Sequence, residues 1–161
     1  MDIKDFKLAP LHTLDKEWAL LTAGNNQAYN TMTVSWGGFG TIWNKPVATV
    51  YVRPNRYTYK FMEDNDYFTL SFYDESYKKD LGILGSKSGR DGDKVALTKL
   101  TPNFLDKTTT FNEAKLTLIC KKLYHQDFDI TNVPNEVAES VYKNEPIHRM
   151  YIGEIVDIVE I

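Results

Sequence analysis

Residues 30–73 read NTMTVSWGGFGTIWNKPVATVYVRPNRYTYKFMEDNDYFTLSFY, and this stretch decides the fold. Residues 31–36 (TMTVSW) alternate hydroxyl and apolar side chains, the period-two pattern of a half-buried strand. Residues 37–40 (GGFG) are expected to break that strand. Residues 47–53 (VATVYVR) are rich in β-branched side chains, and residues 67–73 (YFTLSFY) combine aromatic and apolar ones, so both predict strands.

Outward from this stretch, the same signals predict a small mainly antiparallel β-protein. Asn55 is a suitable N-cap for a helix over residues 56–64. Six or more strands with a few helices predict a β-barrel, closed or partly closed, with flanking helices. We expect one domain over residues 1–161, a length that suits a single core. The other predicted elements are strands at residues 18–23, 114–123 and 149–159, and helices at residues 76–84 and 135–143.

Charge and cysteine content narrow the classes of function. The net charge is -3, from 19 basic and 22 acidic residues, so nothing favours a nucleic-acid partner. The single cysteine, Cys120, excludes an intramolecular disulfide and multi-thiolate metal sites. The 3 histidines lie far apart in the sequence, so we expect no metal site. Cys120 shares a strand face with Leu116 and Leu118 and is expected to be a buried small hydrophobe.

The sequence offers no targeting or membrane signal. Residues 1–10 (MDIKDFKLAP) are polar and lack the apolar core of a secretory signal. No stretch approaches the roughly 20 apolar residues of a membrane-spanning helix. We therefore expect a soluble cytoplasmic protein without a membrane partner.

Common catalytic and nucleotide-binding motifs do not match. The sequence has no G-x-S-x-G and no H-E-x-x-H motif. Residues 82–88 (GILGSKS) end in Lys-Ser like a phosphate-binding loop, but Leu81 and Ser86 stand where that loop needs glycine. The glycines of residues 37–40 do not fit G-x-G-x-x-G. A nucleotide site of the βαβ type is therefore not expected.

The junction of a predicted strand and helix at residues 53–58 (RPNRYT) has the groups that a phosphate monoester needs. A helix start presents free backbone N–H groups and the positive end of the helix dipole. Arg53, Arg56 and Thr58 add two guanidinium groups and a hydroxyl. The alternative is that Asn55 only caps the helix and both arginines are solvated.

Two further segments are candidates for a ligand site. Residues 30–38 form a polar strand that can line the edge of a heteroaromatic ring such as a flavin, or can be an ordinary solvent-facing row of hydroxyls. Residues 85–94 (GSKSGRDGDK) form a polar, basic loop that can close over a ligand or simply be exposed.

Taken together and in this order, these segments resemble the flavin reductase-like family of FMN-binding split barrels, particularly its flavoredoxin-like branch. The matching parts are residues 30–73, the loop at residues 84–95 (LGSKSGRDGDKV) and the closing strand at residues 148–158 (HRMYIGEIVDI). The resemblance covers the chain from about residue 20 to residue 158. It implies a split barrel that acts as a homodimer, with non-covalent FMN near the subunit interface.

The resemblance also implies which residues contact FMN. The strand at residues 32–36 would follow the ring and ribityl chain, residues 53–58 would hold the phosphate, and the loop at residues 86–94 would add polar contacts. His148 matches a histidine that lies near the flavin and helps to position nicotinamide. The alternative is that His148 is only a barrel-edge residue packed beside Tyr151. The FMN contacts implied are Asn30, Thr33, Val34, Ser35, Trp36, Arg53, Arg56, Tyr57, Thr58, Ser88 and Lys94.

The activity that follows is that of an FMN-dependent oxidoreductase with NAD(P)H as co-substrate. Residues 145–147 (EPI) replace the small residues that often precede the histidine in reductases. Whether nicotinamide can reach the flavin is therefore not decided by the sequence. One alternative is a flavoredoxin-type electron-transfer protein that exchanges electrons with a protein partner. Another is a non-catalytic split-barrel module that holds haem, another planar ligand or none.

Overall fold

The backbone is organised around one antiparallel sheet of seven strands. A computed structural model describes residues 2–161, so Met1, the first residue of the expected domain, lies outside the described residues. The strand order is β2-β1-β5-β8-β9-β4-β3. The strands are β1 (Ala19–Gly24), β2 (Tyr29–Val34), β3 (Gly37–Ile42), β4 (Lys45–Val52), β5 (Tyr67–Phe72), β8 (Leu116–Asp127) and β9 (Arg149–Glu160).

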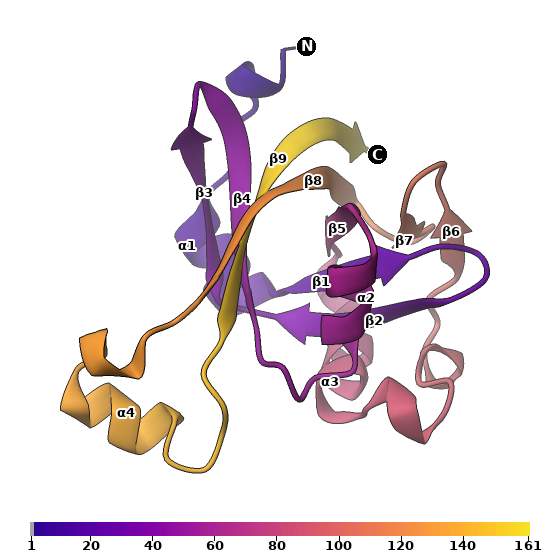
Figure 1. The fold of residues 1–161 in the computed structure, drawn as a ribbon. Coiled ribbons are helices and arrows are strands. Elements are labelled where there is room, and N and C mark those ends of the chain that lie inside the picture. The colour runs from indigo at the N-terminus through magenta and orange to yellow at the C-terminus, as the bar shows by residue number, and fades with distance from the viewer. Residues whose placement is uncertain (1) are drawn as a thin grey trace.

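The sheet is rolled because its two edge strands are neighbours in the sequence. β2 and β3 lie at opposite ends of the strand order, yet only Ser35 and Trp36 separate them. Six strand spacings in a flat sheet would hold the edges about 29 Å apart. The link from Val34 to Gly37 spans at most about 11 Å. The sheet must therefore curl until the edges nearly meet, which gives the expected split barrel (Figure 1).

Smaller elements cover the barrel. Helix α2 packs against β1 and β2, and α3 packs against β2. A second, two-stranded sheet pairs β6 with β7. These elements are β6 (Pro102–Phe104), β7 (Thr109–Phe111), the helices α1 (Pro10–His12), α2 (Thr58–Asp64), α3 (Lys78–Ser86) and α4 (Asn135–Val141), a π-helix at Thr13–Glu17, and 3-10 turns at Ile3–Asp5, Glu75–Tyr77, Gly89–Asp91, Val95–Leu97 and Ile130–Asn132.

The core fills the inside of the barrel. Phe68, Leu70 and Tyr151 are fully buried there, together with Met62 of α2. Cys120 belongs to the same cluster and has no exposed surface, which confirms the prediction of a buried small hydrophobe. Burial raises the pKa of its thiol, so this side chain stays protonated.

The expected strands and helices are present, with their ends shifted by a few residues, but two expectations were wrong. The GGFG stretch does not merely interrupt a strand: β2 already ends at Val34, and GGFG begins a separate strand, β3, which pairs along its whole length with β4. Trp43 and Asn44 both have positive φ (52° and 57°), the geometry of a two-residue hairpin turn, so the ladder continues through the glycines. Gly37 is needed there because a Cβ would lie 2.7 Å from the Thr49 carbonyl oxygen.

The expected cap of α2 was the second error. The amide of Asn55 donates to Oε2 of Glu145 at 3.0 Å instead of capping a helix. The backbone first makes two tight turns, from Arg56 N to Arg53 O and from Tyr59 N to Arg56 O, so the helix begins at Thr58 rather than Arg56.

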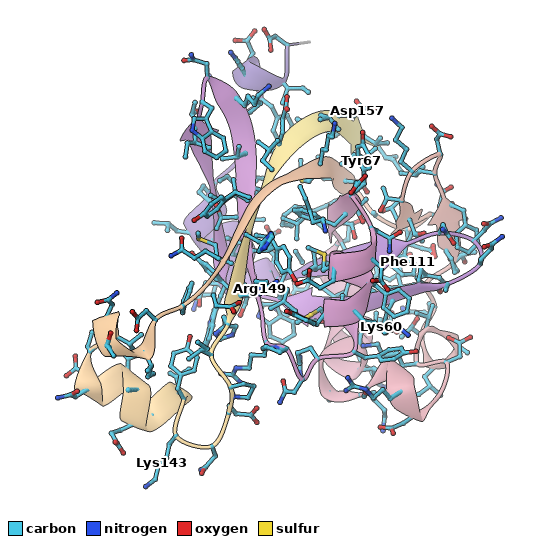
Figure 2. All side chains as sticks on the ribbon, viewed as in Figure 1. Lys60, Tyr67, Phe111, Lys143, Arg149 and Asp157 are labelled. Atoms are coloured by element: carbon cyan, nitrogen blue, oxygen red, sulfur yellow. The ribbon has the colours of Figure 1, made fainter. Side chains whose placement is uncertain are left out.

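The segment between β8 and β9, residues 128–147, forms an arm that carries α4. β8 and β9 extend beyond the barrel as a two-stranded ribbon, and α4 lies away from the rest of the sheet, with Lys143 just after it at the lower edge of the arm in this view (Figures 1 and 2). None of the residues of α4 is buried. At the base of the arm, Arg149 pairs with Asp127 and with Glu63 of α2, both at 2.6 Å, which fixes the start of β9.

Within residues 2–161, no helix is both long enough and apolar enough to cross a membrane.

Gly153 of β9 tests how tightly the barrel interior is filled. A Cβ at this position would lie 2.7 Å from two ring atoms of Phe68 and 3.1 Å from Cβ of Cys120. We expect Gly153→Ala to lower the free energy of unfolding by about 1–3 kcal/mol, since overpacking forces neighbours apart. In the control Gly40→Ala the new methyl meets nothing within 4 Å, so urea unfolding should show little change. Equal stability of the two variants would contradict the packing argument.

Candidate functional site

Two adjoining cavities share three lining residues, Met32, Arg53 and Arg56, and so form one continuous site. The basic cavity has a volume of about 240 Å³. The aromatic cavity has a volume of about 190 Å³. The basic cavity is also lined by Asn30, Asn55, Tyr57, Thr58, Ser86, Lys87, Ser88, Gly89, Arg90, Lys94 and Glu145, and the aromatic cavity by Thr33, Val34, Ser35, Trp36, Tyr51 and His148.

The strand register brings distant parts of the sequence to this place. Val52 at the end of β4 pairs with Arg149 at the start of β9, so Arg53 and His148, the next residues outward, flank the same end of the strand pair. The link between β2 and β3 returns the chain to this end, because Ser35 and Trp36 line the same aromatic cavity. The sheet closure therefore builds one wall of the site, and the β4–β9 pair builds the other.

Arg53 is the central cation of the site. Its Nη2 donates to the Val141 carbonyl at 3.4 Å, and its Nη1 lies 3.9 Å from the Glu145 carboxylate. Its Nε is buried and has no hydrogen-bond partner among the described residues. A buried unpaired guanidinium donor is costly, and such a group commonly marks a place for a ligand, water or ion.

The opposite wall of the basic cavity is packed closely around Thr58. Its hydroxyl accepts a hydrogen bond from the Asn30 amide at 2.7 Å, which leaves its own proton free to be donated. Gly89 packs closely against Asn30 and Tyr57: a Cβ at Gly89 would be 2.3 Å from Oδ1 of Asn30 and 2.8 Å from Cδ2 of Tyr57. The loop after α3 therefore contacts the site through its backbone.

Lys94 anchors the same loop through its side-chain ammonium group. Its Nζ donates to the carbonyls of Leu84 and Lys87 at 3.0 and 3.2 Å. Burial, and to a smaller extent the charge of Arg56, lowers the pKa of Lys94 to about 8. Lys94 thus adds positive charge at neutral pH while it holds the end of α3 to the loop.

Arg90 closes the rim of the basic cavity. Its guanidinium donates to the Asn55 carbonyl at 2.8 Å and lies over the ring of Tyr57, 5.3 Å from the ring centroid. The basic cavity is thus lined by five basic side chains, those of Arg53, Arg56, Lys87, Arg90 and Lys94, and Glu145 is the one carboxylate that lines it among the described residues.

His148 lies at the centre of the aromatic cavity's ring cluster. Its Nδ1 is 2.7 Å from the hydroxyl of Tyr142, and its ring centroid lies 5.6 Å from that of Trp36. Tyr51 and Phe128 complete the cluster at 6.4 and 6.1 Å. Trp36 is 55% exposed, so the cluster opens toward solvent at one side.

The imidazole of His148 is held neutral. Burial lowers its pKa to about 4, and the nearby charges of Arg53 and Arg56 act in the same direction. At neutral pH His148 is therefore a hydrogen-bonding group rather than a cation.

The hydroxyl of Thr33 is already used within the fold. It donates to the Leu81 carbonyl at 2.5 Å and so ties β2 to α3. Its oxygen can accept a hydrogen bond from a ligand, but its proton is committed.

All twelve residues expected from the sequence line one of the two cavities, so the structure brings them together. His148 packs against the rings of Trp36, Tyr51, Phe128 and Tyr142. Among the described ring pairs, the histidine beside Tyr151 is His125, and not His148 as the alternative interpretation expected. Sequence reasoning missed Arg90 and Glu145. Arg90 lay inside the loop already marked as basic, whereas Glu145 was noted only for its place before His148, and it is the arm between β8 and β9 that brings its carboxylate to the basic cavity. The other lining residues missed were Met32, Tyr51, Asn55, Ser86, Lys87 and Gly89.

Among residues 2–161, no group of three or more His, Cys, Asp or Glu side chains is arranged to hold a metal ion.

The comparison with protein families identifies this architecture. Residues 11–161 match the model of the flavin reductase like domain, which is nearly the whole chain. The chain therefore belongs to the flavin reductase-like family, whose split-barrel fold the rolled sheet displays. Comparison with curated proteins finds no match.

Solved structures share the fold. Flavoredoxin from Methanosarcina acetivorans superposes with a TM-score of 0.70 at 22% identity, covering 90% of this chain and 68% of that one. Flavoredoxin of Desulfovibrio vulgaris gives 0.70 at 22%, covering 97% and 76%. An FMN-binding protein from Thermus thermophilus, with bound 1-cyclohex-2-enone, gives 0.68 at 19%, covering 89% and 70%. At these identities the likeness shows the fold.

The low pKa of His148 makes folding stability depend on pH. The native pKa of about 4 lies below the ordinary value of 6.5, so the unfolded chain binds more protons between these values. The free energy of unfolding should fall as the pH drops through this window, and His148→Gln should remove that part of the fall. Urea unfolding of both proteins at pH 7 and pH 4.5 measures it. The wild type should lose more stability than the variant, and equal losses would contradict a buried neutral imidazole.

Proposed function

We propose that this protein binds FMN non-covalently in the two cavities and acts as an NAD(P)H-dependent flavin oxidoreductase. The observation that carries the proposal is the buried Nε of Arg53, which has no hydrogen-bond partner in residues 2–161, on a side chain shared by the basic and aromatic cavities. Family membership supports a flavin, and the charge of the basic cavity supports a phosphate-bearing one.

The residues present fit FMN. A phosphate dianion needs charge-assisted donors and a hydroxyl, and Arg53, Arg56 and Thr58 supply them in the basic cavity. The Ser88 hydroxyl accepts from the backbone N–H of Arg90 and keeps its own proton to donate. The aromatic cavity adjoins this pocket and offers Thr33, Ser35 and Trp36 along one wall, which suits a planar ring with polar edges.

When bound, FMN supplies a two-electron redox centre. The chain's own residues orient the ligands and set the local charge. Arg53 and Arg56 place two positive charges between the cavities, and such charges favour an anionic, electron-rich ring. His148 is neutral and offers a hydrogen bond to a second substrate in the aromatic cavity.

An electron-transfer role remains the second candidate, and a non-catalytic ligand-binding module the third. The shared fold with two flavoredoxins favours the electron carrier, in which a protein partner replaces NAD(P)H. The resemblance to the family also underlies our proposal that the protein acts as a cytoplasmic homodimer with FMN near the subunit interface.

Absorption and turnover separate these candidates. The purified protein is incubated with FMN and desalted, and its visible spectrum is recorded. We expect a retained flavin spectrum and steady oxidation of NADH or NADPH. A yellow protein that oxidises neither donor would support the electron carrier and refute the reductase, and a folded but colourless protein would refute FMN binding.

The double variant Arg53→Ala/Arg56→Ala tests the phosphate site. Each charge-assisted hydrogen bond contributes about 1.5–3 kcal/mol, so FMN affinity should fall by a factor of at least about 100. Titration of FMN fluorescence measures the Kd. Lys121→Ala removes an exposed positive charge outside both cavities and should leave the Kd unchanged. Unchanged affinity in the double variant would contradict the site.

Glu145 should oppose phosphate binding. Its carboxylate lies 3.9 Å from Nη1 of Arg53 and accepts from Asn55, so it lies in the cavity that a dianion must enter. Because the group is half exposed, we expect Glu145→Gln to tighten FMN binding by only about two- to fivefold. Glu139→Gln on α4, outside the cavities, is the matched control. Weaker binding in Glu145→Gln would show instead that Glu145 positions Arg53.

A further inference from the structure

The arm between β8 and β9 contacts the site through few side chains. None of the residues of α4 is buried, and the arm reaches the site through Phe128, Tyr142 and Glu145. Tyr142 is the first residue after α4, and the guanidinium of Arg53 lies over its ring, 5.8 Å from the centroid. Tyr142 therefore has a defined position although the helix before it packs against little.

The hydroxyl of Tyr142 hydrogen-bonds to one ring nitrogen of His148, and the other ring nitrogen is available to a ligand. The Oη–Nδ1 distance of 2.7 Å is that of a good hydrogen bond. Nε2 of His148 has no hydrogen-bond partner among the described residues, and it is not one of their buried, unpaired side-chain atoms. His148 lines the aromatic cavity and Tyr142 does not, so Nε2 is the nitrogen available to a ligand there.

The acid–base chemistry of Tyr142 and His148 determines which ring nitrogen of His148 carries the imidazole proton. His148 is neutral at pH 7 because its pKa is lowered to about 4, so its ring carries a single proton. The pKa of Tyr142 is raised, mainly by burial, so its hydroxyl keeps its proton. A phenol is a better donor than acceptor, whereas an imidazole nitrogen is a strong acceptor. Tyr142 then donates to Nδ1, and the imidazole proton resides on Nε2.

We propose that Tyr142 is a positioning residue that holds His148 in one tautomer, with Nε2–H directed into the aromatic cavity as a donor for a carbonyl or carboxamide oxygen. Four rings already restrict the imidazole, and the Tyr142 hydrogen bond selects which of its nitrogens is the donor. The carboxamide of NADH has such an oxygen, and this part of the inference rests on the proposed reductase function.

The tautomer is measured directly, without cofactor. Long-range ¹⁵N–¹H spectra of FMN-free protein at pH 7 distinguish a protonated from an unprotonated ring nitrogen, and Gln substitutions of His12 and His125 assign the signals. We expect a protonated Nε2 and a bare Nδ1 on His148, and mixed tautomers in Tyr142→Phe. Tyr51→Phe removes a hydroxyl from the same ring cluster but keeps the Tyr142 bond, so its tautomer should match the wild type.

Kinetics of FMN-loaded protein test the consequence. Tyr142→Phe retains the ring over which Arg53 lies and should fold normally. Because the variant loses the neutral hydrogen bond that orients His148, KM for NADH should rise about three- to tenfold, with kcat changed by less than about twofold.

Each result bears on the proposal separately from the reductase function. A wild-type His148 with its proton on Nδ1, or a Tyr142→Phe variant with an unchanged tautomer, would overturn it. A mixed tautomer in Tyr142→Phe, found in a protein that oxidises no nicotinamide, would support the positioning role and refute the reductase. An altered tautomer with unchanged KM and kcat would overturn the assignment of Nε2–H to NADH.

Discussion

The two-residue link between β2 and β3 is the constraint on which the rest of the structure depends. Ser35 and Trp36 connect strands at opposite edges of a seven-stranded sheet, and so short a link can join those edges only if the sheet rolls. The place where the edges approach is also the wall of the aromatic cavity. Fold closure and site formation therefore have the same cause, because Thr33 and Val34 of β2 line the aromatic cavity together with Arg53 after β4 and His148 before β9.

Positive charge is concentrated at the junction of the two cavities. Burial, and to a smaller extent the charges of Arg53 and Arg56, lowers the pKa of His148, and burial with the charge of Arg56 lowers that of Lys94. These shifts are the cost of burying ionisable groups close to like charges. An anion bound between the arginines would relieve that repulsion, so binding and the protonation of neighbouring groups are expected to be linked. Glu145 relieves part of it from the arm.

Much of the fold could be predicted from local pattern, and much of the site's composition from the resemblance to the family. The alternation at residues 31–36 and the β-branched run at 47–53 predicted β2 and β4 because strand periodicity is a property of neighbouring residues. The GGFG stretch misled because glycine's poor strand preference was overridden by pairing with β4. Asn55 misled because its amide found a distant carboxylate, Glu145, rather than a helix end.

By itself the sequence determined six of the strands and the buried character of Cys120, because these follow from periodicity and hydrophobicity, and its resemblance to the family pointed to twelve of the residues that line the cavities. Only the tertiary structure decided how those residues meet. The pairing of Val52 with Arg149 sets Arg53 beside His148, and the arm returns Tyr142 and Glu145 to the site from outside the barrel. Contacts between residues 53 and 148 depend on sheet closure and long-range register, which no local pattern encodes.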